Sequence, residues 1–192
     1  MKISHYFRNN MGKFKTRSME KEIIDLGPDF YTSQEYEQSL KKLFKINKLM
    51  GIFNNTVHLL RQFSQHSVLT DVGCGGGLFL LNLSKYYPKM RLLGLDVSVE
   101  AINLAEKELH EWQQKNEDPP VKFKIQQQPE LEIATNSVDI ILINLVCHHL
   151  DDEELIAFLV KANDTARKAV IINDLHRNVI AYWLYKIISP IL

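Results

Sequence analysis

The segment 71–77 reads Asp-Val-Gly-Cys-Gly-Gly-Gly and places a carboxylate directly before a run of glycines. Glycine reaches positive φ without steric cost and has no Cβ, so such a segment can pass close to a ligand. A second acidic residue, Asp96, ends the apolar run 92–95. An ionised carboxylate only accepts hydrogen bonds, and it can accept from both hydroxyls of a ribose. The two segments therefore predict a ligand-binding turn and a sugar-binding carboxylate.

The residues around the turn indicate which elements position it. The apolar pair 68–69 is typical of the end of a buried strand, and the apolar run 78–83 is typical of a helix that is packed on most sides. A strand, a glycine turn and a helix form the first unit of an open α/β sheet, where ligands bind. A dinucleotide motif would need glycine at position 78, and Leu78 therefore disfavours a nicotinamide enzyme.

These motifs resemble those of class I S-adenosylmethionine-dependent methyltransferases, with 71–77 as the first motif and Gly-Leu-Asp-Val-Ser at 94–98 as the second. The run 126–131 aligns with the third motif of that family. The runs 145–150 and 174–177 resemble segments of small quinone and polyketide methylases. The resemblance covers about residues 68–177. It implies a Rossmann-like fold with S-adenosylmethionine as cofactor and S-adenosylhomocysteine as product.

The resemblance also implies roles for individual residues. The glycines would let the backbone approach the methionine part of the cofactor, and Asp71 would hold its amino group. Val97 would lie against the adenine. The amide oxygen of Gln127 can accept a hydrogen bond from the amino group of the adenine. The cofactor-binding residues implied are Asp71, Gly73, Cys74, Gly75, Gly77, Asp96, Val97, Gln127, Gln128 and Asn144.

Three histidines are the candidate catalytic residues, because the ordinary pKa of histidine lies near neutrality. His148 and His149 follow the fourth expected strand, and His176 follows the fifth. Two interpretations stay open for the adjacent pair: a packed connector, or a general base in the wall of the acceptor pocket. For 174–177 the alternatives are an ion pair between Asp174 and Arg177 or a base at His176. We expect no metal site, since adjacent residues cannot all point at one ion.

Strand and helix patterns alternate along the chain, which predicts a doubly wound, mostly parallel sheet. Further strands are expected at 91–95, 121–125, 138–143 and 169–172. The sequence after the fifth strand predicts a short helix over 179–192 and supplies no sixth or seventh strand, the C-terminal β6–β7 hairpin of the family. The exposed edge of the fifth strand predicts pairing with a second copy in a homodimer, or cover from that last helix.

The chain is expected to form one domain, with an N-terminal arm and cap helices in 1–66 and the cofactor-binding core in 67–192. Helical patterns follow 32 and 52, and whether they cover the cofactor or only pack against the core is open. The first 19 residues contain five Lys or Arg and no acidic residue. This arm is either solvated or in contact with lipid, nucleic acid or the active site.

Composition narrows the function classes. The 192 residues include 23 Lys or Arg and 23 Asp or Glu, so no overall field suggests a nucleic-acid partner. Two cysteines are too few for a disulfide framework and favour a reduced, cytoplasmic setting. No apolar run approaches the roughly 20 residues of a membrane span.

The function expected is an enzyme that transfers a methyl group to a small, apolar, hydroxylated acceptor such as a quinol or a phenol. The apolar side chains after the fourth strand motivate this expectation. One alternative is a non-catalytic module that binds S-adenosylmethionine. Another is a nucleic-acid methyltransferase, which is disfavoured because Asn144-Leu145 stands where such enzymes have an Asn-Pro-Pro-Tyr-like motif.

Overall fold

The structure, a computed structural model, describes residues 28–115, 117–127, 131 and 133–174. The chain divides into two compact units, one of residues 33–174 and the other of residues 1–32 and 175–192. Of the latter unit, residues 28–32 are described, and they include the 3₁₀ helix Pro28–Phe30. None of the helices in the described part of the chain combines the length and hydropathy that crossing a bilayer requires. The predicted arm and last helix lie outside the described residues, and the predicted domain boundary stays a prediction.

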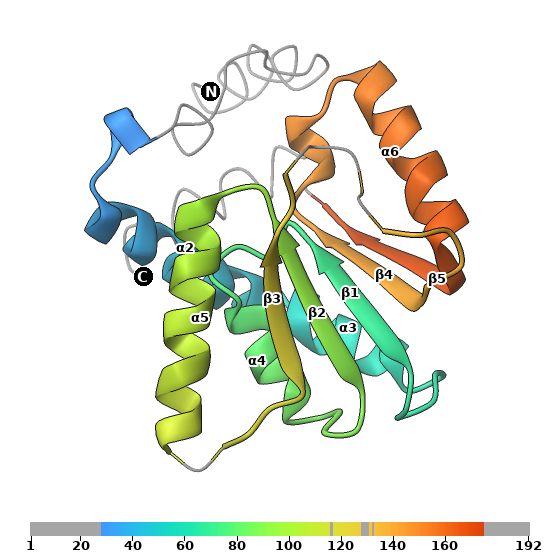
Figure 1. The fold of residues 1–192 in the computed structure, drawn as a ribbon, viewed down its shortest axis with the longest axis horizontal. Coiled ribbons are helices and arrows are strands. Elements are labelled where there is room, and N and C mark those ends of the chain that lie inside the picture. The colour runs from blue at the N-terminus through green and yellow to red at the C-terminus, as the bar shows by residue number, and fades with distance from the viewer. Residues whose placement is uncertain (1–27, 116, 128–130, 132, 175–192) are drawn as a thin grey trace, which may run out of the picture. The chain divides into compact units, whose positions relative to one another are not determined.

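Five parallel strands form the sheet of the unit 33–174, in the order β3-β2-β1-β4-β5 (Figure 1). The order reverses between β1 and β4, which confirms the predicted doubly wound sheet. The strands are β1 (Val68–Val72), β2 (Arg91–Asp96), β3 (Val121–Ile125), β4 (Val138–Asn144) and β5 (Ala166–Asn173). The strands β1, β2, β4 and β5 extend beyond the expected ranges, so that Asp71, Asp96 and Asn144 are strand residues rather than loop residues.

Burial explains the sequence of each strand. Every residue of β4 is buried, as expected for an apolar strand with neighbours on both sides. Alternate residues of β3 are buried up to Phe123, while Lys122 and Lys124 are exposed. Within the described residues β5 pairs with β4 alone and is half-exposed. What covers its outer edge stays a prediction.

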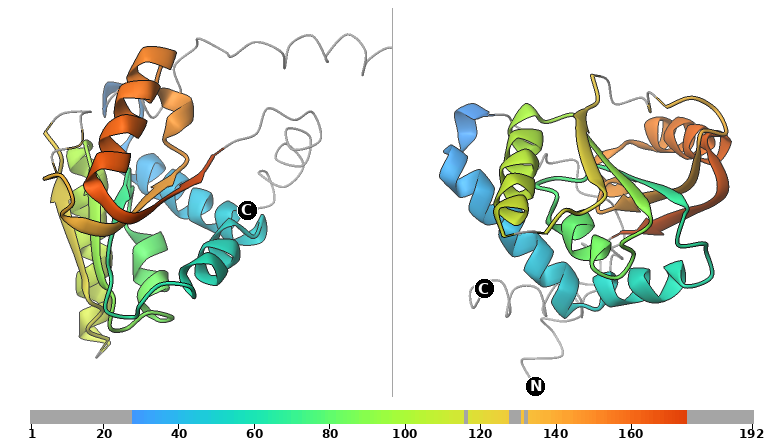
Figure 2. Two further views of the ribbon diagram at one scale, coloured as in Figure 1. Left: turned by 90° about the vertical axis from the view of Figure 1, so that its right-hand side faces the viewer. Right: turned by 60° about the horizontal axis from the view of Figure 1, so that its bottom comes forward.

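Helices cover both faces of the sheet (Figures 1 and 2). They are α2 (Ser33–Leu49), α3 (Ile52–Leu60), α4 (Leu78–Ser84), α5 (Val99–Gln114) and α6 (Asp152–Thr165). Apolar side chains of α3, α4 and α5 share one buried cluster with β1–β4, and those of α6 form a second cluster on the opposite face. Helices α5 and α6 begin with side-chain caps: Ser98 accepts a hydrogen bond from the N–H of Ala101, and Asp151 accepts one from the N–H of Glu154.

Asp139 ties the amino ends of three strands together. Its Oδ2 accepts the N–H of Val68 on β1 at 2.9 Å, and its Oδ1 lies 3.2 Å from Arg167 Nε and 3.1 Å from Lys168 Nζ on β5. Burial raises the pKa of Asp139, but the N–H of Val68 and the two cations outweigh it and lower the pKa to about 2. Asp139 was not among the expected site residues. It lies at the amino ends of the strands, whereas Asp71 lies near the carboxyl end of β1.

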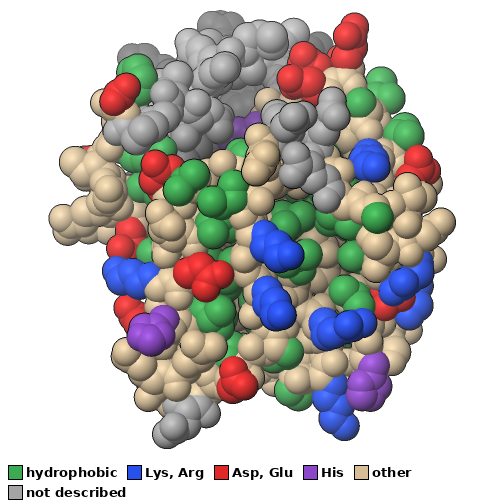
Figure 3. All heavy atoms as spheres, viewed as in Figure 1, with side chains coloured by type: hydrophobic (Ala, Val, Ile, Leu, Met, Phe, Trp, Pro, Cys, Tyr) green, Lys and Arg blue, Asp and Glu red, His purple; other side chains and the backbone are tan. Residues whose placement is uncertain are grey.

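Charged groups do not form a single-sign field on the face that Figure 3 shows, where basic, acidic and apolar side chains are interspersed. This distribution agrees with the equal numbers of basic and acidic residues in the whole chain.

Candidate functional site

The glycine turn is held against the end of β2 by its own backbone. The N–H groups of Gly73 and Cys74 both donate to the carbonyl oxygen of Leu95, at 2.8 and 3.0 Å. The N–H of Gly75 donates to Asp96 Oδ2 at 2.8 Å. The two predicted motifs are therefore in direct contact at the carboxyl edge of the sheet, beside the point where the strand order reverses, and open α/β sheets bind ligands there.

The protein's own side chains explain two of the glycines. Gly73 and Gly77 both have φ of 75°. A Cβ at Gly73 would collide with Val146 Cγ2, and one at Gly77 would lie 2.5 Å from Phe123 Cζ and 2.9 Å from Ala105 Cβ. The sequence analysis attributed the glycines to the approach of a ligand. In the structure, positive φ and packing against the side chains of Val146, Phe123 and Ala105 already require them.

Asp96 points toward the turn. Its Oδ1 accepts the N–H of Ser98 at 2.9 Å, while Oδ2 accepts that of Gly75. Burial raises the pKa of Asp96, and the backbone N–H groups of Ser98, Gly75 and Val97 oppose that rise. The side chain of Val97 is 58% exposed next to this carboxylate, so an apolar surface is available to a flat ring there.

Asp71 is almost completely buried, at 1% exposure. Desolvation and the negative charge of Asp96 raise its pKa to about 8, against a hydrogen bond from Asn144 that lowers it. A buried acid next to a second carboxylate favours a cation over water, because a cation would relieve both effects. This is the electrostatic setting that a ligand's amino group requires.

A chain of amide side chains sets the orientation of Asn144. Asn173 Nδ2 donates to Asn144 Oδ1 at 2.8 Å and to Thr56 Oγ1 at 3.2 Å. With its oxygen turned toward Asn173, Asn144 presents its NH₂ group to Asp71 Oδ1 at 3.4 Å. The sequence analysis missed Asn173 and Thr56. The alignment of Asn173 with Asn144 across β4 and β5 is a register that local sequence patterns do not reveal.

His148 and Asp174 meet at the same edge, although 26 residues separate them. His148 Nδ1 lies 2.7 Å from Asp174 Oδ1, and the backbone N–H of His148 donates to Asp174 Oδ2 at 3.2 Å. The exposed ring of His149 lies 4.0 Å from that of His148, between centroids. Burial and Asp174 raise the pKa of Cys147 to about 11, so its thiol stays protonated near neutrality. The structure thus brings His148 together with Asp174, for which an ion pair with Arg177 was one of the two alternatives; Arg177 lies outside the described residues.

Helix α2 contacts the turn from above the sheet edge. Tyr36 donates its hydroxyl hydrogen to Ser98 Oγ at 3.0 Å, and Leu40 lies beside Gly75 and Gly76. Both residues were missed, because helical periodicity marks them only as an apolar face. Their contacts favour the covering role that the sequence analysis left open for this helix.

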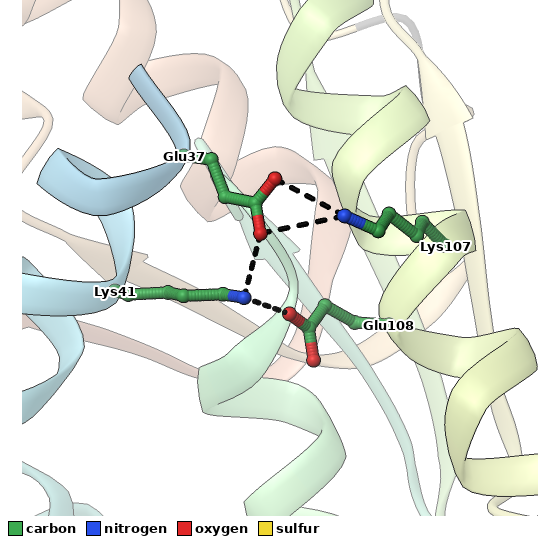
Figure 4. A network of polar contacts seen from close by, with 4 residues as sticks. All are labelled: Glu37, Lys41, Lys107 and Glu108. Atoms are coloured by element: carbon green, nitrogen blue, oxygen red, sulfur yellow. Dashed lines mark hydrogen bonds and ion pairs between the residues drawn. The ribbon is translucent and has the colours of Figure 1, made fainter. Parts of the chain in front are cut away.

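Four charged side chains join α2 to α5 in a network (Figure 4). Lys41 Nζ lies 2.7 Å from Glu37 Oε1 and 2.9 Å from Glu108 Oε1, and Lys107 Nζ lies 3.2 Å from Glu37 Oε2. The hydrogen bonds that Lys41 donates to Glu37 and Glu108 raise the pKa of Lys41, and those that Glu37 accepts from Lys41 and Lys107 lower the pKa of Glu37. The network keeps α2 next to the helix that follows Asp96.

The remaining candidates stay predictions. The Cys74 side chain is buried and lies against Gly94, inside the core, so only its backbone is available to a ligand. Gln127 is exposed, whereas its neighbour Gln126 is buried and donates its backbone N–H to the carbonyl of Asp96. Gln128 and His176 lie outside the described residues. Within the described ranges no cluster of three or more His, Cys, Asp or Glu residues could hold a metal.

Comparisons with known proteins point in one direction. A family model described as a methyltransferase domain matches residues 70–168. A malonyl-[acyl-carrier protein] O-methyltransferase of Legionella pneumophila is 34% identical over 116 residues, which are 59% of this chain and 38% of that protein. An uncharacterised methyltransferase of Schizosaccharomyces pombe is 27% identical over 50% of this chain and 36% of its own length. The chain thus spans about two fifths of the length of these curated relatives.

Solved structures share the fold. A SAM-dependent methyltransferase from Aquifex aeolicus aligns with a TM-score of 0.55 and 23% identity, over 80% of this chain and 86% of that one. Magnesium protoporphyrin IX methyltransferase from Synechocystis, with bound SAH, aligns with a TM-score of 0.59 and 15% identity, over 96% of this chain and 74% of that one.

Proposed function

Because the chain belongs to the class I S-adenosylmethionine-dependent methyltransferase family, we propose that it transfers the methyl group of S-adenosylmethionine to a small, apolar, hydroxylated acceptor of quinol or phenol type. One observation carries the cofactor assignment: Asp71 and Asp96 lie at the carboxyl ends of adjacent parallel strands, and a glycine turn that donates a backbone hydrogen bond to Asp96 lies beside them. The family match covers the segment that contains all three.

The residues at this edge would divide the binding work. Asp71 would pair with the amino group of the methionine part, and Asn144 keeps that carboxylate oriented. Asp96 has further lone pairs to offer the ribose hydroxyls. Val97 would pack against the adenine, and Gln127 would accept a hydrogen bond from the amino group of the adenine. The bound cofactor would supply an electrophilic methyl group on a sulfonium.

The acceptor side is supported by side chains that follow β4. Leu145, Val146 and Leu150 are partly buried apolar residues around the 3₁₀ helix η3 (Cys147–His149). Such a surface suits an apolar acceptor, and His148 places a polar group beside it. Holding the acceptor oxygen in line with the methyl group can lower the barrier by about 7–11 kcal/mol.

Titration calorimetry with S-adenosylmethionine and S-adenosylhomocysteine tests the cofactor assignment. Asp96→Asn removes charge-assisted contacts of about 1.5–3 kcal/mol, so we expect the dissociation constant to rise roughly 10- to 150-fold. Glu106→Gln, an exposed change on α5, is the matched control and should bind like the wild type. Absence of binding to the wild-type protein at millimolar cofactor would refute the proposal, and binding without methyl transfer to any acceptor would favour the non-catalytic module.

A second acceptor class is favoured by the name of the Legionella relative: a carboxyl group on a thioester-bound acyl chain. A carboxylate is already ionised near neutrality and needs no base, whereas a phenol must lose a proton. Incubation with labelled S-adenosylmethionine and either a substituted hydroquinone or a malonyl thioester distinguishes the two classes. Labelling of the thioester alone would overturn the hydroxylated acceptor.

A further inference from the structure

We propose that Asp174 is a positioning residue: it holds the ring of His148 as the Nδ1–H tautomer, and the Nε2 of His148 takes the proton of an acceptor hydroxyl. The inference rests on the proposed function and deepens it, because it selects one of three candidate histidines and requires an acceptor that carries a proton. The assignment starts from two contacts that Asp174 makes with the same residue.

The tautomer follows from hydrogen-bonding capacity. An ionised carboxylate has no hydrogen to donate, so the contact of 2.7 Å between Asp174 Oδ1 and His148 Nδ1 requires a hydrogen on Nδ1. In a neutral ring the lone pair is then on Nε2. The second oxygen of Asp174 accepts the backbone N–H of His148, so the carboxylate fixes the ring relative to its own main chain.

The backbone between β4 and His148 is held in a strained conformation. Leu145, directly after β4, has φ of 56°, a region that bulky residues rarely occupy. Its N–H donates to the carbonyl of Asn173 at 2.8 Å, which ties the exit of β4 to the exit of β5. Strained backbone persists where the surroundings determine it, and such residues cluster at functional sites. Here the strained turn delivers His148 to the acid that follows Asn173.

His148 and Asp174 lie close to the proposed cofactor turn, as a base that acts on the acceptor must. Val146, two residues before His148, lies against Gly73 of the cofactor turn. Asn144, just before the strained turn, contacts Asp71. The side chains of His148 and Asp174 are 22% and 17% exposed, so the pair is mostly shielded from solvent without being fully buried. The contact of 2.7 Å between Asp174 Oδ1 and His148 Nδ1 favours His148 as the base.

In the proposed step, the methyl group moves to the acceptor oxygen and the proton of that oxygen moves to His148. The hydroxyl oxygen of the acceptor forms a bond to the methyl carbon while its proton moves to His148 Nε2. The bond between that carbon and sulfur breaks, and its electron pair stays on sulfur as a neutral thioether. The positive charge that leaves the sulfonium is thereby transferred to the imidazole, next to the Asp174 carboxylate, which stabilises it.

Histidine tautomers can be measured directly by two-bond ¹H–¹⁵N correlation spectra of protein labelled with ¹⁵N-histidine, at mildly alkaline pH. The His148 signal is assigned by its loss in His148→Gln. We expect the Nδ1–H pattern for His148, and the Nε2–H pattern that imidazole favours in water for the exposed His66, the internal reference. In Asp174→Asn the Nδ1–H pattern of His148 should be lost, while His66 is unchanged.

Two results would overturn the proposal. One is an Nε2–H pattern for His148 in the wild-type protein, which decides the matter even if Asp174→Asn does not fold. The other is an Nδ1–H pattern that survives in a folded Asp174→Asn. Calorimetry keeps this separate from the proposed function: Asp174→Asn should bind S-adenosylhomocysteine within about twofold of wild type, and lack of cofactor binding by the wild type would refute that function without changing the tautomer.

Discussion

Replacing Asp71 with asparagine is expected to stabilise the ligand-free protein at neutral pH while weakening cofactor binding. The folded-state pKa of Asp71 is about 8, against an ordinary value of 3.8. Between these values the folded state binds a proton that the unfolded state has released. The contribution of Asp71 to the free energy of unfolding therefore decreases as pH rises from about 4 to about 8.

The size of the effect follows from the same two values. At pH 7 the raised pKa of Asp71 corresponds to a cost of about 4 kcal/mol relative to the unfolded chain, and at pH 4.5 to about 1 kcal/mol. The carboxamide in Asp71→Asn does not titrate. Between these pH values, the free energy of unfolding of the wild type should thus fall by about 3 kcal/mol more than that of the variant.

Urea unfolding of both proteins across this pH range measures the difference. Asp118→Asn, an exposed change in the loop before β3, is the control and should follow the wild type. Calorimetry in buffers of different ionisation enthalpy gives a second test, since cofactor binding at pH 7 should release close to one proton from the wild type and none from Asp71→Asn. Parallel pH profiles for wild type and Asp71→Asn would refute the assignment of Asp71 as a buried acid.

Three further predictions concern the framework around the site. Gly77→Ala should lower the free energy of unfolding by about 3 kcal/mol, because φ is positive and the new Cβ would collide with Phe123. Gly51→Ala, where φ is similar but the space is open, should lower it by about 1 kcal/mol, and urea titration of both variants measures the difference. Asp139→Asn should cost about 1–3 kcal/mol at pH 7, and this difference should vanish as acid protonates Asp139 between pH 4 and pH 2. Lys41→Met should cost about 1 kcal/mol, less in molar salt, and should weaken cofactor binding by loosening α2; an effect independent of salt would contradict the ionic origin.

Much of the fold follows from local patterns. The apolar run of β4 and the alternation of β3 predict a buried and a half-exposed strand; β3 has the expected bounds and β4 extends one residue further. The glycine turn and Asp96 were expected to face the same ligand, because one strand–helix–strand unit brings them to the same end of the sheet, and they are in contact there. Local patterns suffice here because each depends on residues that are close in sequence or on a fixed right-handed connection.

The rest depends on register between distant strands. Nothing near Asn173 in the sequence shows that it lies opposite Asn144, and nothing near Asp174 shows that it contacts His148. The role of Gly77 was likewise hidden, since Phe123 comes from a strand 46 residues later. Such contacts follow from the packing of the whole unit, which periodicity and composition do not encode.

The amide chain from Thr56 through Asn173 and Asn144 to Asp71 has a consequence for evolution and engineering. A change at any one position alters the orientation of the next, so substitutions should show epistasis rather than independent effects. Exchanges at these positions are expected to be tolerated only in combination, so Thr56 on α3 should vary together with the residues of the proposed cofactor site.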